Sequence, residues 1–133
     1  MKNNTKIIIF LFFSIILIGH NKIYASEIQF TTSEINITDN GNTTNAGPGS
    51  AYSEIDNIKI NGQSFRLDKT SSLLIANDAK AFLLEENIEI QADKLLYDQK
   101  ISMIRALGNV KIKDLTHNIT LNSEEAIYKK NDN

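Results

Sequence analysis

Apolar and polar residues alternate with a period of two along most of the chain after residue 26. The clearest stretch, "IEIQADKLLYDQKISMIRALGNVKIKD", runs from Ile88 to Asp114, and its alternation pauses and then resumes. Such alternation, in a sequence rich in Ile, Leu and Tyr, is typical of half-buried β-strands. Gly108-Asn109 suits a tight turn or a bulge. The strands expected in this stretch are 88–92, 94–98, 102–107 and 110–113.

Two earlier segments have the same pattern, and a different composition separates them. Residues 26–38 alternate, and the pattern returns between Ile58 and Leu67. Between them, "NGNTTNAGPG" at 40–49 contains the only proline and three of the six glycines. We therefore expect a turn followed by a loose loop at 40–49.

The segment 71–86, "SSLLIANDAKAFLLEE", allows two interpretations. Leu73, Leu74, Phe82 and Leu83 have a spacing that an amphipathic helix tolerates, and Ala, Leu and Glu are good helix formers. The corresponding segment one repeat later, "MIRALGNVKI", is strand-like. The repeat therefore favours a strand, and the helix remains the alternative.

The alternating pattern repeats with a period of 30 and then 31 residues. Ile60, Ile90 and Leu121 occupy equivalent positions in three successive units. The same offset brings Leu67, Tyr97 and Tyr128 into line. A repeat of this length predicts stacked β units, each of which buries its apolar face only with help from its neighbours. Because the third unit stops shortly after its tyrosine, we expect a fold that is incomplete at the C-terminal end, with a strand edge that another protein covers or that further sequence completes.

The first 25 residues have the layout of a secretory signal peptide. Lys2 and Lys6 form a basic start, an apolar run follows from 7 to 18, and Ala25 precedes a cleavage point before Ser26. The run is shorter than the roughly 20 apolar residues that span a bilayer, although an uncleaved anchor is the alternative. We therefore expect an exported protein whose β-repeat domain covers 26–133. The chain has no cysteine, so burial and strand pairing must stabilise this domain without disulfides.

The net charge and the candidate metal-binding and catalytic residues exclude several classes of function. From residue 26 the chain has 11 basic and 16 acidic residues, a net charge of −5, and this balance argues against nucleic-acid binding. His117 is the only histidine after the signal segment, and zinc sites need three or four His or Cys ligands, so we expect no metal. Asp93 and Asp98 stand at polar breaks in the strand pattern, where turn or edge positions explain them better than a catalytic pair does. We expect no enzyme activity and no cofactor.

The positive signal is a set of apolar residues that would share one face of the strands. Such a stripe has two interpretations: an ordinary closed core, or the lining of a trough that remains open for an apolar ligand. The residues expected on this face are Ile88, Ile90, Ala92, Leu95, Tyr97, Ile104, Ala106, Val110, Ile112, Ile119, Leu121 and Tyr128.

The stretch 88–114 resembles the repeat of the OstA-like family of lipopolysaccharide transport proteins. The family pattern is I-x-A-D, then an aromatic-Asp pair, then x-A-x-G-N-V-x-I, and "NITLNSEEAIYKKND" looks like the start of another copy. The copy from Ile58 matches more loosely, because Asn61-Gly62 replaces Gln91-Ala92 and the G-N-V turn is missing. The residues that match the pattern are Ile90, Ala92, Asp93, Tyr97, Asp98, Ala106, Gly108, Asn109, Val110 and Ile112.

This resemblance implies a fold and a function. It implies an all-β, repeat-built antiparallel jelly-roll-like trough, with two sheets meeting in a V. The acyl chains of lipid A would lie between the sheets during transfer to the outer membrane, and the protein would work in the periplasm or in association with the outer membrane. Partners would be lipopolysaccharide and other β-trough proteins, a second copy included, joined by edge-strand pairing. Whether the chain is a bridge protein or the N-terminal part of an outer-membrane translocon stays open, and an exported structural or adhesive β-repeat protein with a closed core is the alternative.

Overall fold

A computed structural model describes residues 27–130, so the expected signal peptide at 1–25 lies outside the described residues. The described chain is all-β, with a single 3₁₀ turn, η1, at Asp39–Gly41. The short strands are β1 (Gln29–Thr32), β2 (Ile35–Thr38), β3 (Thr43–Ala46), β4 (Gly49–Ser53), β5 (Ile58–Gly62) and β6 (Ser64–Asp68). The long strands are β7 (Leu73–Leu83), β8 (Ile88–Asp98), β9 (Met103–Asp114) and β10 (Ile119–Lys129).

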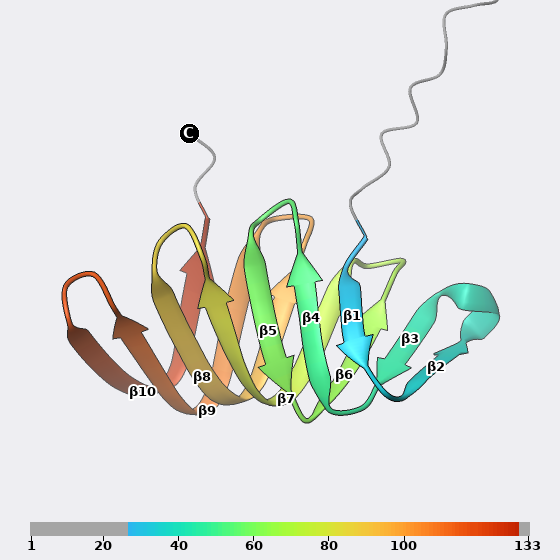
Figure 1. The fold of residues 1–133 in the computed structure, drawn as a ribbon, viewed down its shortest axis with the longest axis horizontal. Helices are drawn as coiled ribbons and strands as arrows, with labels where there is room; N and C mark the ends of the chain where they lie inside the picture. The colour runs from blue at the N-terminus through green and yellow to red at the C-terminus, as the bar shows by residue number, and fades with distance from the viewer. Residues whose placement is uncertain (1–26, 131–133) are drawn as a thin grey trace, which may run out of the picture.

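The ten strands form one open antiparallel sheet that is folded into two layers (Figure 1). Each long strand bends near its middle and belongs to both layers. In β7, residues 73–77 pair with β6, whereas residues 80–83 pair with β5. The first layer therefore contains β1, β4, β5 and one half of each long strand, and the second layer contains β2, β3, β6 and the other halves. The two sheets expected from the sequence are two layers of one hydrogen-bonded sheet.

The bends lie where the polar breaks interrupt the alternation. Asp78 in β7 has φ of 45°, and in β9 Gly108 and Asn109 have φ of 78° and 47°. The pairing register shifts between Gln91 and Lys94 in β8 and again in β10. An extra residue on one strand is a bulge, which bends the strand and increases its twist. The expected strands 88–92 and 94–98 are thus the two halves of β8, and 102–107 and 110–113 are the two halves of β9.

Two expectations for individual segments have different outcomes. The preference for a strand over a helix in 71–86 is confirmed, because β7 occupies Leu73–Leu83. The loose loop expected at 40–49 is wrong, because this segment contains part of η1 and all of β3. The backbone of β3 pairs with β6 and β2 on either side, and this tertiary pairing outweighs the local turn-forming residues.

The 30-residue repeat is confirmed in the turns. The first-layer turns 54–57, 84–87 and 115–118 each end in an asparagine with positive φ: Asn57, Asn87 and Asn118. Successive turns bond to each other, since Leu84 N donates to Asn57 O at 3.2 Å and Leu115 N donates to Asn87 O at 3.0 Å. Asparagine tolerates the left-handed conformation better than other side chains do. These turns and the second-layer turns 69–72 and 99–102 together form the rim, opposite the bends.

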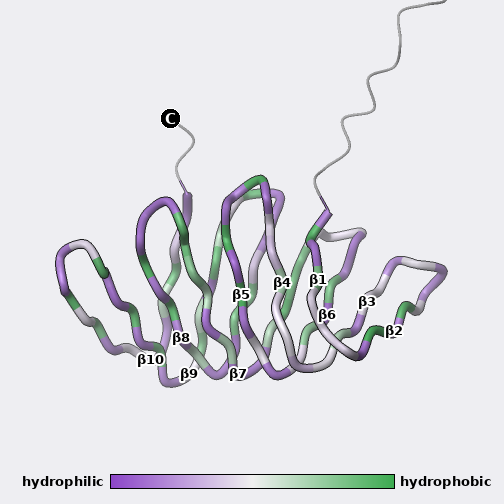
Figure 2. The backbone as a smooth tube through the Cα atoms, in the orientation of Figure 1, coloured by the Kyte–Doolittle hydropathy of each residue, from purple (hydrophilic) through white to green (hydrophobic). Residues whose placement is uncertain are grey.

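The apolar side chains point inward between the layers, in rows that cross the sheet. One row follows the pairing register from Leu67 through Leu74, Tyr97 and Ile104 to Tyr128. Figure 2 shows hydrophobic and hydrophilic positions alternating along several of the strands. The inward residues form one core cluster that extends from Ile28 to Val110.

Candidate functional site: the interior and its rim

The twelve residues expected on the apolar face lie in three environments. The first group is buried, at 0–4% exposure, and comprises Ile90, Ala92, Leu95, Tyr97, Ile104, Ala106 and Val110. The second group is half-buried and comprises Ile88, Ile112 and Tyr128. The last two, Ile119 and Leu121, are 50% and 58% exposed. The exposed fraction of these side chains rises toward β10 because no described strand pairs with the outer edge of β10.

The middle of the interior is a packed core. Leu95 is 0% exposed, and its register neighbours Ala76 and Ala106 are 0% and 1% exposed. Small alanine side chains therefore allow the layers to approach each other here. The described residues contain no buried side-chain nitrogen or oxygen without a hydrogen-bond partner. This part of the interior has the character of an ordinary protein core.

The N-terminal end of the interior opens into an apolar cleft of about 290 Å³. Ile35 and Ile37 of β2 form one side and are 53% and 56% exposed. Phe30 of β1 forms another side and packs edge to face against Phe65, with ring centroids 5.8 Å apart. The sequence indicated alternating strands here, but these cleft residues were not among the expected site residues. The alternation of apolar and polar residues in 26–38 was the sequence signal that could have identified them.

Tyr97 connects the two layers at the rim. Its side chain starts in the second layer and is 1% exposed. Its hydroxyl donates to the carboxylate of Asp56, in the first-layer turn 54–57, and makes a 2.8 Å hydrogen bond with Ser53 Oγ. Ser102 Oγ donates to Asp56 Oδ1 at 2.8 Å, so a second hydroxyl from the second layer meets the same carboxylate. Burial, and then the hydrogen bond to the Asp56 carboxylate, raise the pKa of Tyr97 far above its usual value.

A similar contact recurs one unit later. The Tyr128 hydroxyl donates to Glu86 Oε1 at 2.9 Å, and Lys130 Nζ lies 2.9 Å from Glu85 Oε2. Burial, followed by the hydrogen bond to Glu86, raises the pKa of Tyr128 to about 12. The Lys130 ammonium lowers the pKa of Glu85 through its hydrogen bond and its charge. Each of these contacts joins the second layer to a turn of the first layer.

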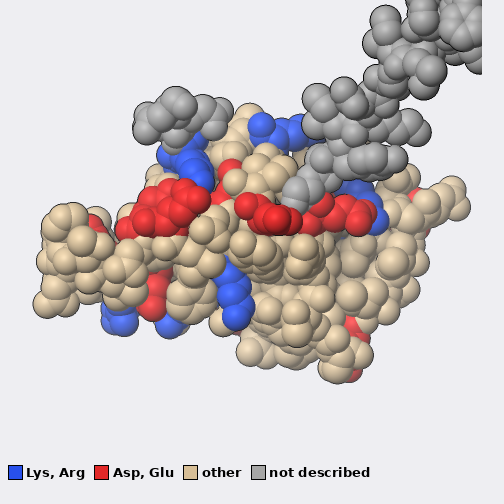
Figure 3. Space-filling view, turned by 45° about the horizontal axis from the view of Figure 1, so that its top comes forward, with Lys and Arg blue, Asp and Glu red and all other residues tan. Residues whose placement is uncertain are grey.

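The third first-layer turn, 115–118, differs from the first two. His117 occupies the repeat position of Asp56 and Glu86. Its Nδ1 lies 2.7 Å from Oδ2 of Asp114, the last residue of β9. The backbone hydrogen bond from His117 N, and then this side-chain contact, lower the pKa of Asp114. In Figure 3 the carboxylates form a red band, with blue lysine and arginine groups on either side.

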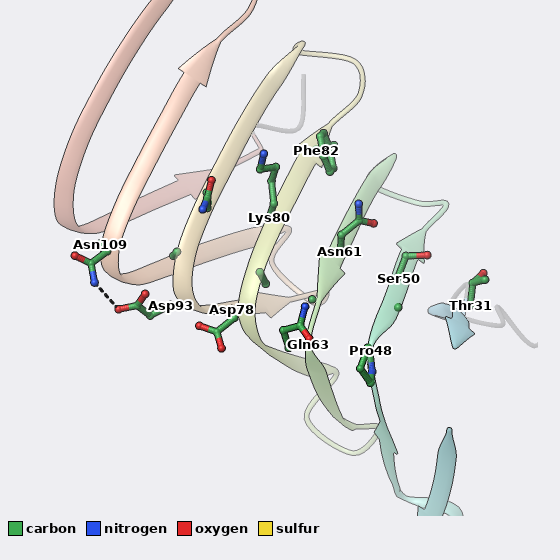
Figure 4. Close-up of a pocket in the computed structure, with 15 residues that line it drawn as sticks. Thr31, Pro48, Ser50, Asn61, Gln63, Asp78, Lys80, Phe82, Asp93 and Asn109 are labelled. Carbon is green, nitrogen blue, oxygen red and sulfur yellow. Dashed lines mark hydrogen bonds between the residues drawn. The ribbon is translucent and has the colours of Figure 1, made fainter. Parts of the chain in front are cut away.

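The outer face carries a separate groove of about 790 Å³ beside the bends, with a mixed polar and apolar lining (Figure 4). Asn61 and Lys80 point outward from the first layer, and Asp78 and Asp93 lie at the bends. Asn109 Nδ2 donates to Asp93 Oδ2 at 2.8 Å, so this carboxylate has a structural partner. These groups stand outside the apolar interior and do not line it.

Asp93 and Asp98 lie at opposite ends of the second-layer half of β8. Asp93 is at the bend, whereas Asp98 ends the strand at the rim and accepts a hydrogen bond from Lys100 N at 3.0 Å. Five strand residues span about 17 Å, so the two carboxylates do not converge. Asp98 precedes the turn 99–102, as the sequence predicted, whereas Asp93 lies exposed at the bend inside β8, which is neither a turn nor a strand edge.

Within residues 27–130, no group of three or more His, Asp or Glu side chains is placed to hold a metal ion. The same residues include no helix with the length and apolar character needed to cross a membrane. Among protein-family models and among curated proteins, none matches this chain. The class that the fold defines is an all-β protein built on one open, folded antiparallel sheet.

Proposed function

We propose that this protein holds the acyl chains of lipopolysaccharide against the apolar inner face of its folded sheet. It passes the lipid toward the outer membrane and catalyses no reaction. The observation that carries the proposal is the inner face itself. It is apolar along the sheet, and it is uncovered at both ends, at Ile35 and Ile37 and again at Ile119 and Leu121. The motif resemblance in 88–114 supplies the lipid class.

The physics of such a site suits a carrier. Burial of apolar area contributes about 25 cal/mol per Å², so several acyl chains would bind strongly. The attraction is not directional, so a chain can slide along the face without breaking specific bonds. Sugars and phosphates would remain outside, at the polar rim, and would need no desolvation.

The edges of the sheet support partners of the same architecture. Edge strand β10 is eleven residues long, and its unpaired backbone can accept another strand. In the first layer six antiparallel strand pairings lead from β10 to β1, and in the second layer six lead from β10 to β2. Because six is an even number, β1 and β2 run parallel to the halves of β10 in their own layers. A second copy in the same orientation would therefore add its β1 and β2 parallel to β10. The proposed location is the periplasm, as a bridge protein or as part of an outer-membrane translocon.

Photocrosslinking on β10 tests this function. A photoreactive residue is placed in cells at Leu121, on the inner face, or at Asn122, its outward neighbour, because both side chains are exposed and neither change disturbs the core. We expect a lipopolysaccharide adduct at Leu121 and none at Asn122. Equal adducts, or none at Leu121 in a folded and exported protein, would contradict the proposal.

The second candidate is an exported structural β-repeat protein with a closed core. The burial of Leu95, Tyr97 and Ile104 to 0–1% exposure favours it, because no ligand space separates the layers at these residues. In that case Leu121 would crosslink to a protein neighbour and not to lipid. The same experiment therefore separates the two functions by the mass of the adduct.

A further inference from the structure

The Tyr97 side chain crosses the interior near the rim at mid-length of the inward row. Leu67 and Leu74 precede it in this row, and Ile104 and Tyr128 follow it. Leu67 and Leu74 end in methyl groups, but the Tyr97 hydroxyl reaches the opposite layer at Ser53 and Asp56. Apolar material that moves along the row from β10 toward the N-terminal cleft would meet this ring.

The contact between the layers at this point is made by side chains. Side chains from the second layer hold the turn 54–57: Tyr97 and Ser102 bond to the Asp56 carboxylate, and Lys130 Nζ lies 3.3 Å from Asp56 O. The backbone hydrogen bond from Leu84 N to Asn57 O, at the end of this turn, runs along the rim and not across the interior. Separation of the layers at the rim therefore breaks side-chain contacts and leaves the strand ladder intact.

We propose that Tyr97 and Asp56 form a gate that closes the interior at mid-length, and that acyl chains pass only when this contact opens. The proposal rests on the function proposed above and adds its control point. In the closed state the open end at β10 and the N-terminal cleft are separated by the packed core around Leu95. The Tyr128–Glu86 contact is a half-buried copy of the gate, and its tyrosine belongs to β10 itself.

The test uses purified protein in which a diazirine analogue replaces leucine, because this analogue nearly preserves the shape of the side chain. After addition of lipopolysaccharide and illumination, mass spectrometry maps adducts at Leu121, on the open end, and at Leu95, which lies two residues from Tyr97 on β8 in the packed core that the gate closes. Tyr97→Phe keeps the ring and removes the hydroxyl. Tyr52→Phe is the matched control, because Tyr52 donates to Asn57 Oδ1 at 3.1 Å from the outer side of the same turn.

A second variant locks the gate. Asp56→Cys with Ser102→Cys places two thiols where the native side chains are 2.8 Å apart, and the chain contains no other cysteine. A short, reducible bifunctional thiol reagent joins them. This variant keeps Tyr97, so it reports on opening even if Tyr97→Phe fails to fold.

The adduct at Leu95, relative to Leu121, decides the outcome. We expect it to rise on the order of tenfold in Tyr97→Phe, since a hydrogen bond to a charged group is lost. It should be unchanged in Tyr52→Phe, and it should disappear in the bridged variant until reduction restores it. Equal labelling of Leu95 in every form, with Leu121 labelled, would overturn the gate alone. The absence of adducts at Leu121 in every form would overturn the proposed function, and the gate with it.

Discussion

Asn109 donates a hydrogen bond from Nδ2 to Asp93 Oδ2, 2.8 Å away, across the bends of two neighbouring strands. Gly108 lies against the same carboxylate, and a Cβ atom added there would stand 2.6 Å from Asp93 Oδ2. The Ala-Asp pair at 92–93 and the Gly-Asn pair at 108–109 of the repeat motif therefore contact each other and together form one bend of the sheet. Their role is to fold the sheet, and this places the apolar rows of both layers opposite each other.

Gly108→Ala should weaken the fold through this bend. Gly108 has φ of 78°, which costs an alanine about 1–2 kcal/mol, and the new methyl group also displaces Asp93. Gly41→Ala is the matched control, because Gly41 has φ of 92° but nothing within 4 Å of the added atom. Urea unfolding should show a loss at least about 1 kcal/mol greater for Gly108→Ala than for Gly41→Ala. Equal losses would mean that Asp93 moves aside freely.

Tyr97→Phe should lower the free energy of unfolding by about 1.5–3 kcal/mol at neutral pH, because a buried hydrogen bond to a carboxylate is lost. Tyr52→Phe removes a hydroxyl that makes a part-buried hydrogen bond to a neutral amide, and it should cost about 1 kcal/mol or less. Chemical denaturation of the two variants gives the comparison. A Tyr97→Phe protein as stable as the native one would show that Ser102 alone satisfies Asp56.

Alkaline pH should destabilise the protein through the rim tyrosines. A tyrosine ordinarily ionises near pH 10.0, and in the folded protein the pKa of Tyr128 is raised to about 12. The folded state therefore favours the neutral phenol, and this contribution to stability is complete below pH 10 and is lost as the pH rises toward 12. Thermal unfolding at pH values from 8 to 12 should show a smaller alkaline loss for Tyr128→Phe than for the native protein. Parallel curves would indicate that Tyr128 ionises equally in both states.

Core substitutions should distinguish the closed middle from the open end. Leu95 is 0% exposed, so Leu95→Ala should cost about 2–5 kcal/mol. Leu121 points to the same interior but is 58% exposed, so Leu121→Ala should change stability by about 0.5 kcal/mol or less. Denaturant midpoints measure both. A large loss at Leu121 would show that a partner or a second copy buries this residue in solution.

Local pattern was sufficient for much of this fold. The period of two identified the strand segments, and the 30-residue repeat identified 71–86 as a strand although its composition also permitted a helix. Gly108-Asn109 was correctly placed at a bulge or turn, because only a few residue types tolerate a positive φ. The segment 40–49 was misjudged, since β3 depends on pairing with β6, which its own residues do not encode.

The partners across the interior could not be predicted from the sequence. Tyr97 and Asp56 are 41 residues apart, and Asp56 occupies a turn in which an acidic residue is ordinary. The exposure of Ile35, Ile37, Ile119 and Leu121 depends on which strands end the sheet. By itself the sequence determined which residues face inward, because side-chain direction follows from the two-residue period of a strand. Only the tertiary structure decided which inward residues meet, how closely the layers pack and where the interior stays open, because these depend on where the strands bend and pair.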